Sequence, residues 1–515
     1  MIKKLIDKLL GKPAATARKS AQGKRVEVEA AEHAIDLSLV DDNAIRVVKT
    51  LADAGYEAYI VGGAVRDLLV GLRPKDFDVA TNATPEQVKG LFRRAFIIGR
   101  RFRIVHVVYG RGREHEVIEV STFRAVMDAS AAEQVTGNEK TSKSELAGKT
   151  HVVDAAGRVL RDNVWGPQIE DAARRDFTVN AMYYDPQRQI VVDYHGGIKD
   201  AKKKVLRMIG DPATRYREDP VRIIRVVRFA AKLGFTIEAK TKAPIREMAS
   251  LLHSVPASRT FDEMIKLLQT GHALASIEEL KKQGLAGGGQ GFFPILDLVI
   301  ENGAKHPERA KFVNAALADT DRRVGEGKPV APSFMLACML WHDVLDGWQR
   351  LKKKGEAPFP ALTQAVDAVF DARIGDISGR GKLGADMREI WLMQPRFERR
   401  TGNGPLTLVE QTRFRAGFDF LRLRADAGEI DPALATWWEE FSMADPEDRP
   451  HMIQDVRKTE RRAPAPRQQA AAPAAASSDD DEDDLPPTEA GDAPRKRRRR
   501  RRKPAGSGSS SSDAA

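Results

Sequence analysis

Residues 59–81, YIVGGAVRDLLVGLRPKDFDVAT, constrain the fold more than any other part of this chain. They predict an apolar strand, a turn at Gly62 and Gly63, a short helix, and a second strand that carries Asp76 and Asp78. Successive side chains of a strand point to opposite faces, so we expect the two aspartates to project together. Neighbouring carboxylates repel each other, and a divalent cation such as Mg²⁺ makes their pairing favourable.

An Asp-x-Asp pair is common on solvated strand edges, so the residues around it decide its meaning. Gly62 and Gly63 stand between a strand and a helix, where exposed backbone N–H groups can hold a triphosphate. Glu119 is expected to join Asp76 and Asp78 as a third carboxylate. These groups suit nucleotidyl transfer, in which one ion activates a hydroxyl and both stabilise the reacting phosphate.

Composition indicates several domains and a reducing compartment. The 515 residues, 42% of them hydrophobic, suffice for two to four domains. The single cysteine, Cys338, excludes an internal disulfide framework and fits a cytoplasmic protein. No apolar run approaches the roughly 20 residues of a membrane span, and the opening MIKKLIDKLLGKP lacks the features of a secretory signal.

Basic charge gathers at both ends of the chain. Of the formal net charge of +11, residues 1–30 hold +5 and residues 461–515 hold +3. Such ends favour a polyanionic partner bound with salt-sensitive affinity. The final segment is rich in Ala, Pro and Ser, with an acidic block at 479–484 and a basic block at 495–503, and is predicted to be disordered.

The segments on either side of residues 59–81 predict two helices and a hairpin. One helix is expected over 41–54, and the sequence TPEQ from Thr84 predicts a second helix with a capping box. Residues 96–110 and 117–123 are rich in β-branched side chains and predict a hairpin, whose second strand carries Glu119.

A polar loop without apolar periodicity is expected over 127–150. A helix is expected over 168–182, with several charged residues in its first turns. A pair of strands joined by a Gly-Gly turn at 196–197 is expected to close the first domain.

Beyond residue 219 the chain is predicted to be mostly helical. Residues 221–233, VRIIRVVRFAAKL, predict a helix with a basic stripe. The stripe comprises Arg222, Arg225, Arg228 and Lys232. Further helices are expected over 260–283, 293–302, 307–323, 332–351, 360–374, 384–394 and 407–426.

Three motifs resemble, in the same order, those of the class II nucleotidyltransferases, which include bacterial poly(A) polymerases and CCA-adding enzymes. They are GGAVRDLL with KDFDVATNATP, then EDAARRDFTVNA, then REDPVRIIRVVRFAAKLGF. Together they span roughly residues 35–270, and the resemblance fades beyond.

The resemblance implies a role for individual residues, with ATP as the substrate and two Mg²⁺ ions as cofactors. Asp76 and Asp78 would bind the metal ions, with Glu119 assisting, and Gly62, Gly63 and Arg66 would face the triphosphate. Asp171 and Arg174 would read the base. Arg222 and Arg225 would hold phosphate or brace the base-reading helix.

The base-reading pair has a physical rationale. Asp171 and Arg174 stand at i and i+3, which puts an acceptor and a donor on one helix face. Adenine and cytosine each present an amino donor beside a ring-nitrogen acceptor, whereas guanine and uracil present the reverse. The pair therefore accepts A and C and rejects G and U. The same spacing also fits a surface salt bridge worth a few tenths of a kcal/mol.

The choice between A and C depends on residues 97–107, IIGRRFRIVHV. They resemble the stretch that marks bacterial poly(A) polymerases, which is shorter and less basic in CCA-adding relatives. An ordinary basic hairpin edge would explain the arginines as well, so the arginines alone do not decide between A and C. The preference for A rests on the unbroken match IIGRRF. The long basic ends agree, since an enzyme with one compact tRNA substrate has less use for them.

His342-Asp343 invites comparison with metal-dependent HD phosphohydrolases, but only scattered further ligands such as His306 exist, so we disfavour that activity. The basic block at 495–503 has the composition of a nuclear-type signal, and we interpret it as an RNA tether.

The predicted fold class is α+β: a nucleotidyltransferase head with a small mixed sheet and helices, then all-α neck and body domains and a disordered tail. The expected domains are a basic flexible arm (1–34), the head (35–205), a neck that binds nucleotide and RNA (206–270), a body that binds RNA (271–460) and the tail (461–515).

The predicted function is template-independent addition of AMP from ATP to RNA 3'-OH ends, with release of pyrophosphate. The resemblance implies that the tails mark bacterial RNA for decay and that RNA-decay proteins are candidate partners, beside RNA bound by the basic ends. The alternatives are a CCA-adding tRNA nucleotidyltransferase and a non-catalytic RNA-binding protein on the same fold.

Overall fold

The structure is a computed structural model that describes residues 23–99, 103–110, 115–125, 133–134, 151–153, 159–162, 164–373 and 380–462. Residues 1–460 form one unit of the chain and residues 461–515 another. Several expectations lie outside the described residues, namely those for the arm to residue 22, for 100–102, for the turn at 111–114, for most of the loop 127–150 and for the tail beyond 462.

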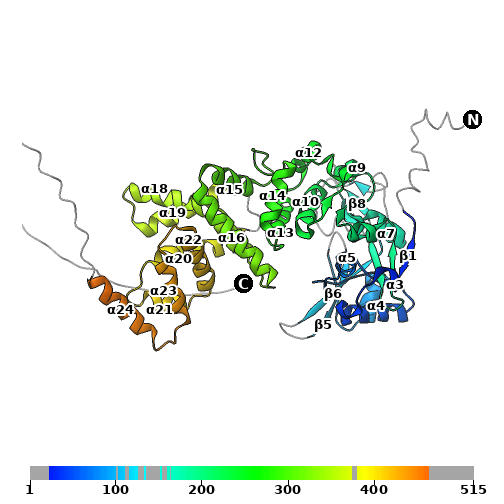
Figure 1. The fold of residues 1–515 in the computed structure, drawn as a ribbon, viewed down its shortest axis with the longest axis horizontal. Helices are drawn as coiled ribbons and strands as arrows, with labels where there is room; N and C mark the ends of the chain where they lie inside the picture. Colours follow the sequence, from blue (N-terminus) through cyan, green and yellow to red (C-terminus); the bar gives the residue numbers. More distant parts are fainter. Residues whose placement is uncertain are drawn as a thin grey trace, which may run out of the picture. The chain divides into compact units, whose positions relative to one another are not determined.

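The strands come early in the chain, from the blue to the green part of the colour range in Figure 1. They are β1 (Val26–Glu29), β2 (Ala58–Val61), β3 (Asp78–Thr81), β4 (Ala95–Ile98), β5 (Ile104–Tyr109), β6 (Glu116–Thr122), β7 (Glu133–Gln134), β8 (His151–Val153), β9 (Val159–Asp162), β10 (Met182–Asp185), β11 (Ile190–Asp193), β12 (Val205–Leu206) and β13 (Thr236–Ile237). Eight of them form one mixed sheet in the order β1-β11-β10-β2-β3-β6-β5-β4, in which only β3 and β6 pair in parallel.

The helices that accompany the sheet are α3 (Ala30–His33), α4 (Asp42–Asp53), α5 (Gly63–Leu69), α6 (Pro85–Leu91), α7 (Gln168–Arg174), α8 (Gly197–Lys202) and the 3-10 turns η1 (Leu37–Leu39) and η3 (Thr178–Asn180). The helices that follow are α9 (Pro212–Glu218), α10 (Val221–Leu233), α11 (Ala239–Lys242), α12 (Ile245–Met248), η4 (Ala249–Ser254), α13 (Ala257–Leu268), α14 (Ala273–Gln283), α15 (Pro294–Lys305), α16 (Pro307–Gly325), α17 (Pro332–Met339), α18 (Trp341–Lys353), α19 (Pro358–Ala372), α20 (Arg380–Phe397), α21 (Gly404–Val409), α22 (Phe414–Ala427), α23 (Pro432–Met443) and α24 (Arg449–Arg462).

Local sequence signals account for several of these boundaries. The Asp41 side chain caps α4 by accepting hydrogen bonds from the backbone N–H groups of the first turn. Thr84 and Gln87 form the expected capping box of α6. Helix α10 ends at Gly234, which has a left-handed backbone. The α+β fold class and these elements are confirmed, as is the hairpin of β5 and β6.

The strand expected to carry both aspartates is shorter than predicted. Strand β3 begins at Asp78, which pairs with Val61 of β2 and with Glu119 of β6, whereas Asp76 lies in the preceding bend. The partner strand β2 ends at Val61 because the turn at Gly62 follows, so no ladder is available to Asp76.

The helix expected over 168–182 ends at Arg174, so that prediction was wrong in its second half. Arg175 has an extended backbone with φ of −64° and ψ of 164°. The Nη2 atom of Arg215 donates to the backbone oxygens of Arg174 and Arg175, at 2.7 and 2.6 Å. Because this side chain satisfies both carbonyls, they need no further helical turn.

The predicted Gly-Gly turn at 196–197 was also misplaced. The connection between β10 and β11 lies at 186–189, where the Asp185 carboxylate accepts from two backbone N–H groups of the turn. Gly197 instead begins α8, and a Cβ there would lie 2.3 Å from the backbone oxygen of Thr178. This glycine serves close packing rather than a hairpin.

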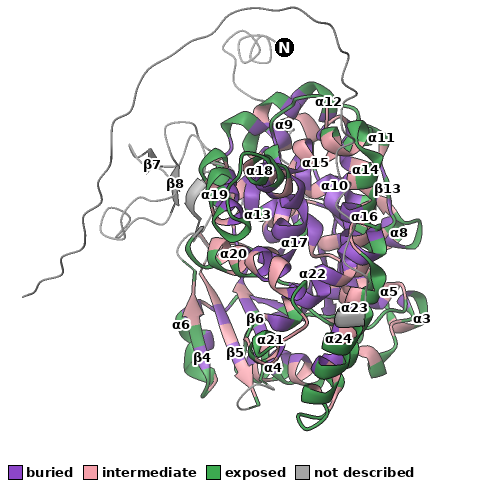
Figure 2. Cartoon of the chain, turned by 90° about the vertical axis from the view of Figure 1, so that its left-hand side faces the viewer, coloured by how far each residue is buried: buried purple, intermediate pink, exposed green. Residues whose placement is uncertain are grey.

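The helical region contains more breaks than the sequence predicted. The single helix expected over 260–283 is divided near Gly271, whose φ is +78°, and the one expected over 332–351 is divided at Leu340. The helix expected over 407–426 is two helices, and α23 and α24 had no predicted counterpart. Figure 2 shows buried residues concentrated in α10, α17 and α22.

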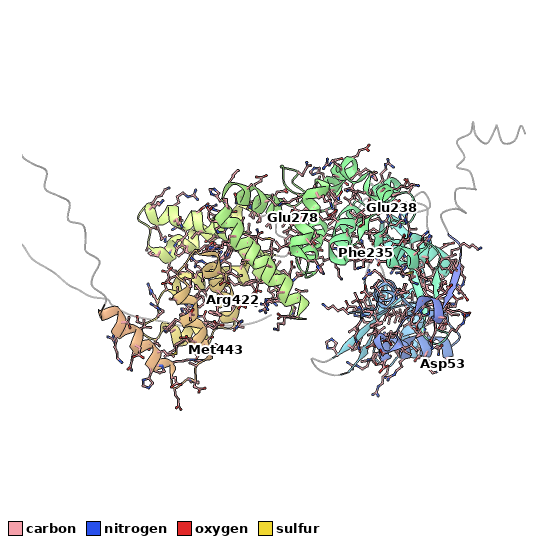
Figure 3. The ribbon with its side chains drawn as sticks, viewed as in Figure 1. Asp53, Phe235, Glu238, Glu278, Arg422 and Met443 are labelled. Atoms are coloured by element: carbon pink, nitrogen blue, oxygen red, sulfur yellow. The ribbon has the colours of Figure 1, made fainter. Side chains whose placement is uncertain are left out.

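Polar contacts tie the helices together beside their apolar packing. Arg422 of α22, labelled in Figure 3, pairs with Asp319 of α16 at 3.2 Å. Met443, also labelled there, ends α23 with 73% of its surface exposed. Among the described residues, no helix is long and apolar enough to cross a membrane.

Candidate active site

The turn after β2 brings backbone close to a cavity of about 650 Å³. Gly62 has φ of +77° and ψ of −131°, a conformation that side chains with a Cβ strongly disfavour. A Cβ on Gly63 would lie 3.3 Å from a terminal nitrogen of Arg66. Both glycines line the cavity, so the turn leaves its backbone accessible to a ligand there.

Arg66, one turn into α5, lines the same cavity although only 4% of its surface is exposed. Its Nε donates to Asp67 Oδ1 at 2.8 Å, and its Nη1 donates to Asn180 Oδ1 at 2.7 Å. These contacts fix the guanidinium beneath the glycine turn.

Asp76 and Asp78 both line the cavity, although only Asp78 belongs to strand β3. Desolvation raises the pKa of the Asp78 carboxyl to about 6, the charges of Glu119 and Asp76 add to the effect, and Arg175 opposes it. Neither carboxylate has a hydrogen bond or ion pair to another described residue. Crowded oxygen ligands of this kind fit a hard divalent cation, because such an ion would neutralise their repulsion.

Glu119 lies beside Asp78 in the parallel register of β3 and β6, as expected. Its Oε1 is 3.3 Å from His106 Nε2, and it is not among the residues that line the cavity. Within the described part of the chain, no three His, Cys, Asp or Glu side chains form a cluster suited to a metal ion. Glu119 therefore acts on Asp78 through its charge in this structure.

Asp171 and Arg174 share helix α7 but differ in their surroundings. Arg174 lines the cavity. Asp171 is 6% exposed and accepts hydrogen bonds from Arg175 at 3.0 and 3.2 Å, from the Tyr183 hydroxyl at 2.8 Å and from the backbone of Arg124 at 3.2 Å. Burial would raise the pKa of the Asp171 carboxyl, but the neighbouring arginines and Tyr183 hold it below its ordinary value.

Arg222 and Arg225 of α10 also line the cavity, and both are engaged by carboxylates. Arg225 pairs with Asp176 through two nitrogens, one of them Nε at 2.9 Å. Arg222 pairs with Glu218 at 2.8 Å. Three residues of the predicted α10 stripe, Arg222, Arg225 and Lys232, line the cavity. Arg228 is instead 9% exposed and pairs with Glu263 at 3.2 Å.

Sequence reasoning gave no role to several residues of the cavity. They are Asp67, Lys75, Arg175, Asp176, Asn180, Asp219, Val221, Phe229, Lys232, Arg259 and Glu263. Most lie within the three quoted motifs, so the charged residues of those motifs were the sequence feature from which these site residues could have been predicted. Glu263 and Arg259 come from α13, and their proximity depends on how α10 and α13 pack.

His342 has a structural environment. Its Nε2 lies 2.7 Å from Glu429 Oε1, and Phe312 packs against its ring edge. No metal-ligating cluster includes it among the described residues.

Comparison with protein families gives three matches along the chain. Residues 58–207 match the poly A polymerase head domain. Residues 234–297 match the family described as "Probable RNA and SrmB- binding site of polymerase A", and residues 354–504 match the arginine-rich C-terminus of polymerase A.

Curated relatives agree with these matches. Poly(A) polymerase I of Haemophilus influenzae is 40% identical over 87% of this chain and 95% of its own length. Poly(A) polymerase I of Escherichia coli O6:H1 is 40% identical over 82% of this chain and 87% of its own length. The CCA-adding enzyme of Lactobacillus helveticus is more distant, at 36% identity over 44% of this chain and 49% of its own length. The chain therefore belongs to the poly(A) polymerase I family of nucleotidyltransferase enzymes.

Proposed function

We propose that this enzyme transfers AMP from ATP to the 3'-OH of RNA without a template and releases pyrophosphate. The observation that carries the proposal is the cavity in which Asp76 and Asp78 lie together with the glycine turn. Asp76 and Asp78 would hold two Mg²⁺ ions, and Glu119 would support Asp78 from the neighbouring strand. Bound there, the ions would lower the pKa of the RNA hydroxyl and neutralise phosphate charge.

The transfer is an in-line substitution at the α-phosphate. The RNA O3' atom loses its proton and forms a bond to the α-phosphorus of ATP, and the bond from that phosphorus to the bridging oxygen breaks. Pyrophosphate leaves with the electron pair of the broken bond. Gly62 and Gly63 would face the triphosphate, with the backbone N–H of Gly63 as donor, because the N–H of Gly62 donates to the backbone oxygen of Met182 at 3.3 Å. The buried Arg66 would support the turn from below.

Asp171 and Arg174 would read the adenine. Arg174 already faces the cavity, whereas the Oδ2 atom of Asp171 accepts from both Arg175 and Tyr183. Its Oδ1 accepts only from the backbone of Arg124 among the described residues, at 3.2 Å. Asp171 is not among the residues that line the cavity, so its role requires Oδ1, whose second lone pair can accept from the adenine amino group, to become accessible when ATP binds.

Arg222 and Arg225 would brace the site rather than bind phosphate directly, because each is held by a carboxylate. Asp176, the partner of Arg225, follows α7 directly, so this pair ties the base-reading helix to α10. We also propose the domain limits 35–205, 206–270 and 271–460 for head, neck and body.

The proposal includes the biological setting. Tails added by this enzyme would mark RNA for exonucleolytic decay in the cytoplasm, with RNA-decay proteins as partners and with the basic ends of the chain contacting RNA. The arginine-rich match at 354–504 supports contact with a polyanion.

Substitution of a proposed metal ligand tests catalysis. Asp76→Ala should abolish AMP incorporation into an RNA oligonucleotide, while RNA binding in a gel shift survives. Undiminished incorporation would refute the catalytic assignment, and a wild-type protein that binds RNA but incorporates nothing would support a binding protein instead.

A nucleotide panel tests specificity. Purified protein is incubated with a non-tRNA oligonucleotide and each NTP separately. A long ladder with ATP alone supports adenylyl transfer, whereas CTP-dependent addition confined to truncated tRNA would support the CCA-adding alternative.

A further inference from the structure

The charges around the cavity separate into two groups, those with partners and those without. Six carboxylates and eight basic side chains line it. Most are held in ion pairs: Arg66 with Asp67 at 2.7 Å, Arg175 with Asp171 at 3.0 Å, Arg222 with Glu218 at 2.8 Å, Arg225 with Asp176, Arg259 with Asp219 at 3.2 Å, and Glu263 with Arg228 at 3.2 Å. Arg174 is engaged as well.

Two carboxylates and two cations remain. Around this cavity, within the part of the chain that the structure describes, Asp76, Asp78, Lys75 and Lys232 have no ion pair or hydrogen bond. A charged side chain without a protein partner can bind a ligand directly. A charged side chain in an ion pair must first break that pair, which costs free energy. The two aspartates are the proposed metal ligands, which leaves the two lysines for an anion.

Lys232 lines the cavity together with the glycine turn and Arg66. It occupies the last turn of α10, and its electrostatic neighbours include Arg66, Asp67 and Asp76. Arg66 in turn sits directly beneath Gly63. Desolvation lowers the pKa of the Lys232 ammonium and the charge of Arg66 lowers it further, and a bound anion would relieve both effects.

We propose that Lys232 binds the β- and γ-phosphates of the incoming ATP and the pyrophosphate that leaves. The inference rests on the proposed function and adds a phosphate ligand to it. An ammonium is a compact point charge with three rotatable donors, so it can follow the phosphates as charge shifts onto the leaving group. The arginines of α10, which are held by carboxylates, would keep their positions during the reaction.

The test compares Lys232→Met and Lys232→Arg with a matched control, Lys240→Met. Lys240 is an exposed lysine of α11 outside the cavity. Loss of a charge-assisted phosphate contact should raise the KM for ATP about tenfold or more. The inhibition constant of pyrophosphate should rise in parallel, and the KM for RNA should stay unchanged. Lys232→Arg should recover part of both affinities, and Lys240→Met should match the wild type.

An unchanged KM for ATP in Lys232→Met would overturn the inference, as would a rise confined to the KM for RNA. A melting curve for each variant separates these results from misfolding, and the arginine variant preserves the test if the methionine variant unfolds. Failure of the proposed function itself is distinguishable, because the wild type would then add no AMP.

Discussion

The cavity that Asp76 and Asp78 line and the surroundings of His342 both contain many charged side chains, yet they differ in how completely those charges are paired. Glu429 accepts from Trp341 Nε1 at 3.0 Å and from Arg424 Nε at 3.2 Å, and it lies 2.7 Å from His342. Burial would raise the pKa of the Glu429 carboxyl, but these partners hold it below its ordinary value. In the cavity, by contrast, Asp76 and Asp78 repel each other without a protein partner.

The comparison shows that residue type alone does not identify a site. The sequence contains a His-Asp pair like that of HD phosphohydrolases, an activity we disfavour, and the fold uses its histidine as a partner of the half-buried Glu429. Complete pairing stabilises the helical region, whereas incomplete pairing at the cavity costs stability and leaves charge for a ligand.

The largest effect is expected from the unpaired carboxylates. Asp78→Asn should lower kcat/KM on the order of 10³-fold or more, because a metal ligand and its charge are lost. Steady-state incorporation of AMP measures it. Asp53→Asn is the control, since Asp53 forms an exposed pair with Lys49 on α4 and lies at the far end of that helix (Figure 3). Equal losses in both variants would contradict the assignment.

The paired network should respond in stability instead of chemistry. Glu429→Ala removes the carboxylate that pairs with His342 and Arg424, while Arg424 keeps its hydrogen bond to Gln394. The loss should cost roughly 3–5 kcal/mol of folding free energy. Urea unfolding midpoints measure the change. Activity per folded molecule should be preserved. A loss of kcat in the folded fraction would contradict the conclusion that the charges around His342 serve stability rather than catalysis.

The glycine turn should show a smaller, mixed effect. Gly62→Ala forces a Cβ into a backbone conformation with φ of +77° and should cost about 1–3 kcal/mol, together with a higher KM for ATP. Gly90→Ala is the matched control, because Gly90 lies in the exposed face of α6 with nothing near its Cβ position. That control should be neutral or slightly stabilising. A fully stable Gly62→Ala protein would show that the turn tolerates a side chain.

The smallest effect is a pH dependence of stability in Mg²⁺-free buffer. The folded protein raises the pKa of Asp78 to about 6, so the folded state holds this proton more tightly than the unfolded state does. Stability should therefore fall as pH rises from about 4 through about 6. Because Asp78 is partly open to solvent, the loss should be only on the order of 1 kcal/mol. The melting temperatures of the wild type and of Asp78→Asn, measured against pH, should diverge over this range. Parallel curves would rule out the raised pKa of Asp78.

Local signals made much of the fold predictable from sequence. The caps of α4 and α6, the basic stripe of α10 and its stop at Gly234 depend on residues within one or two turns. The helix over 168–182 failed for the opposite reason. Its end at Arg174 depends on Arg215, 41 residues later, which no local pattern contains.

The sequence by itself determined the reaction class, because the spacing of Asp76 and Asp78 after a glycine turn and the order of three motifs are local features. Only the tertiary structure decided which charges of those motifs are available. Asp176 and Asp219 look equivalent to the two aspartates in the sequence, and each is neutralised by an arginine brought to it by folding. Ion pairing depends on the distance between charges in space, because the Coulomb energy falls with separation. The packing of α10 on α13 and the sheet sets those distances.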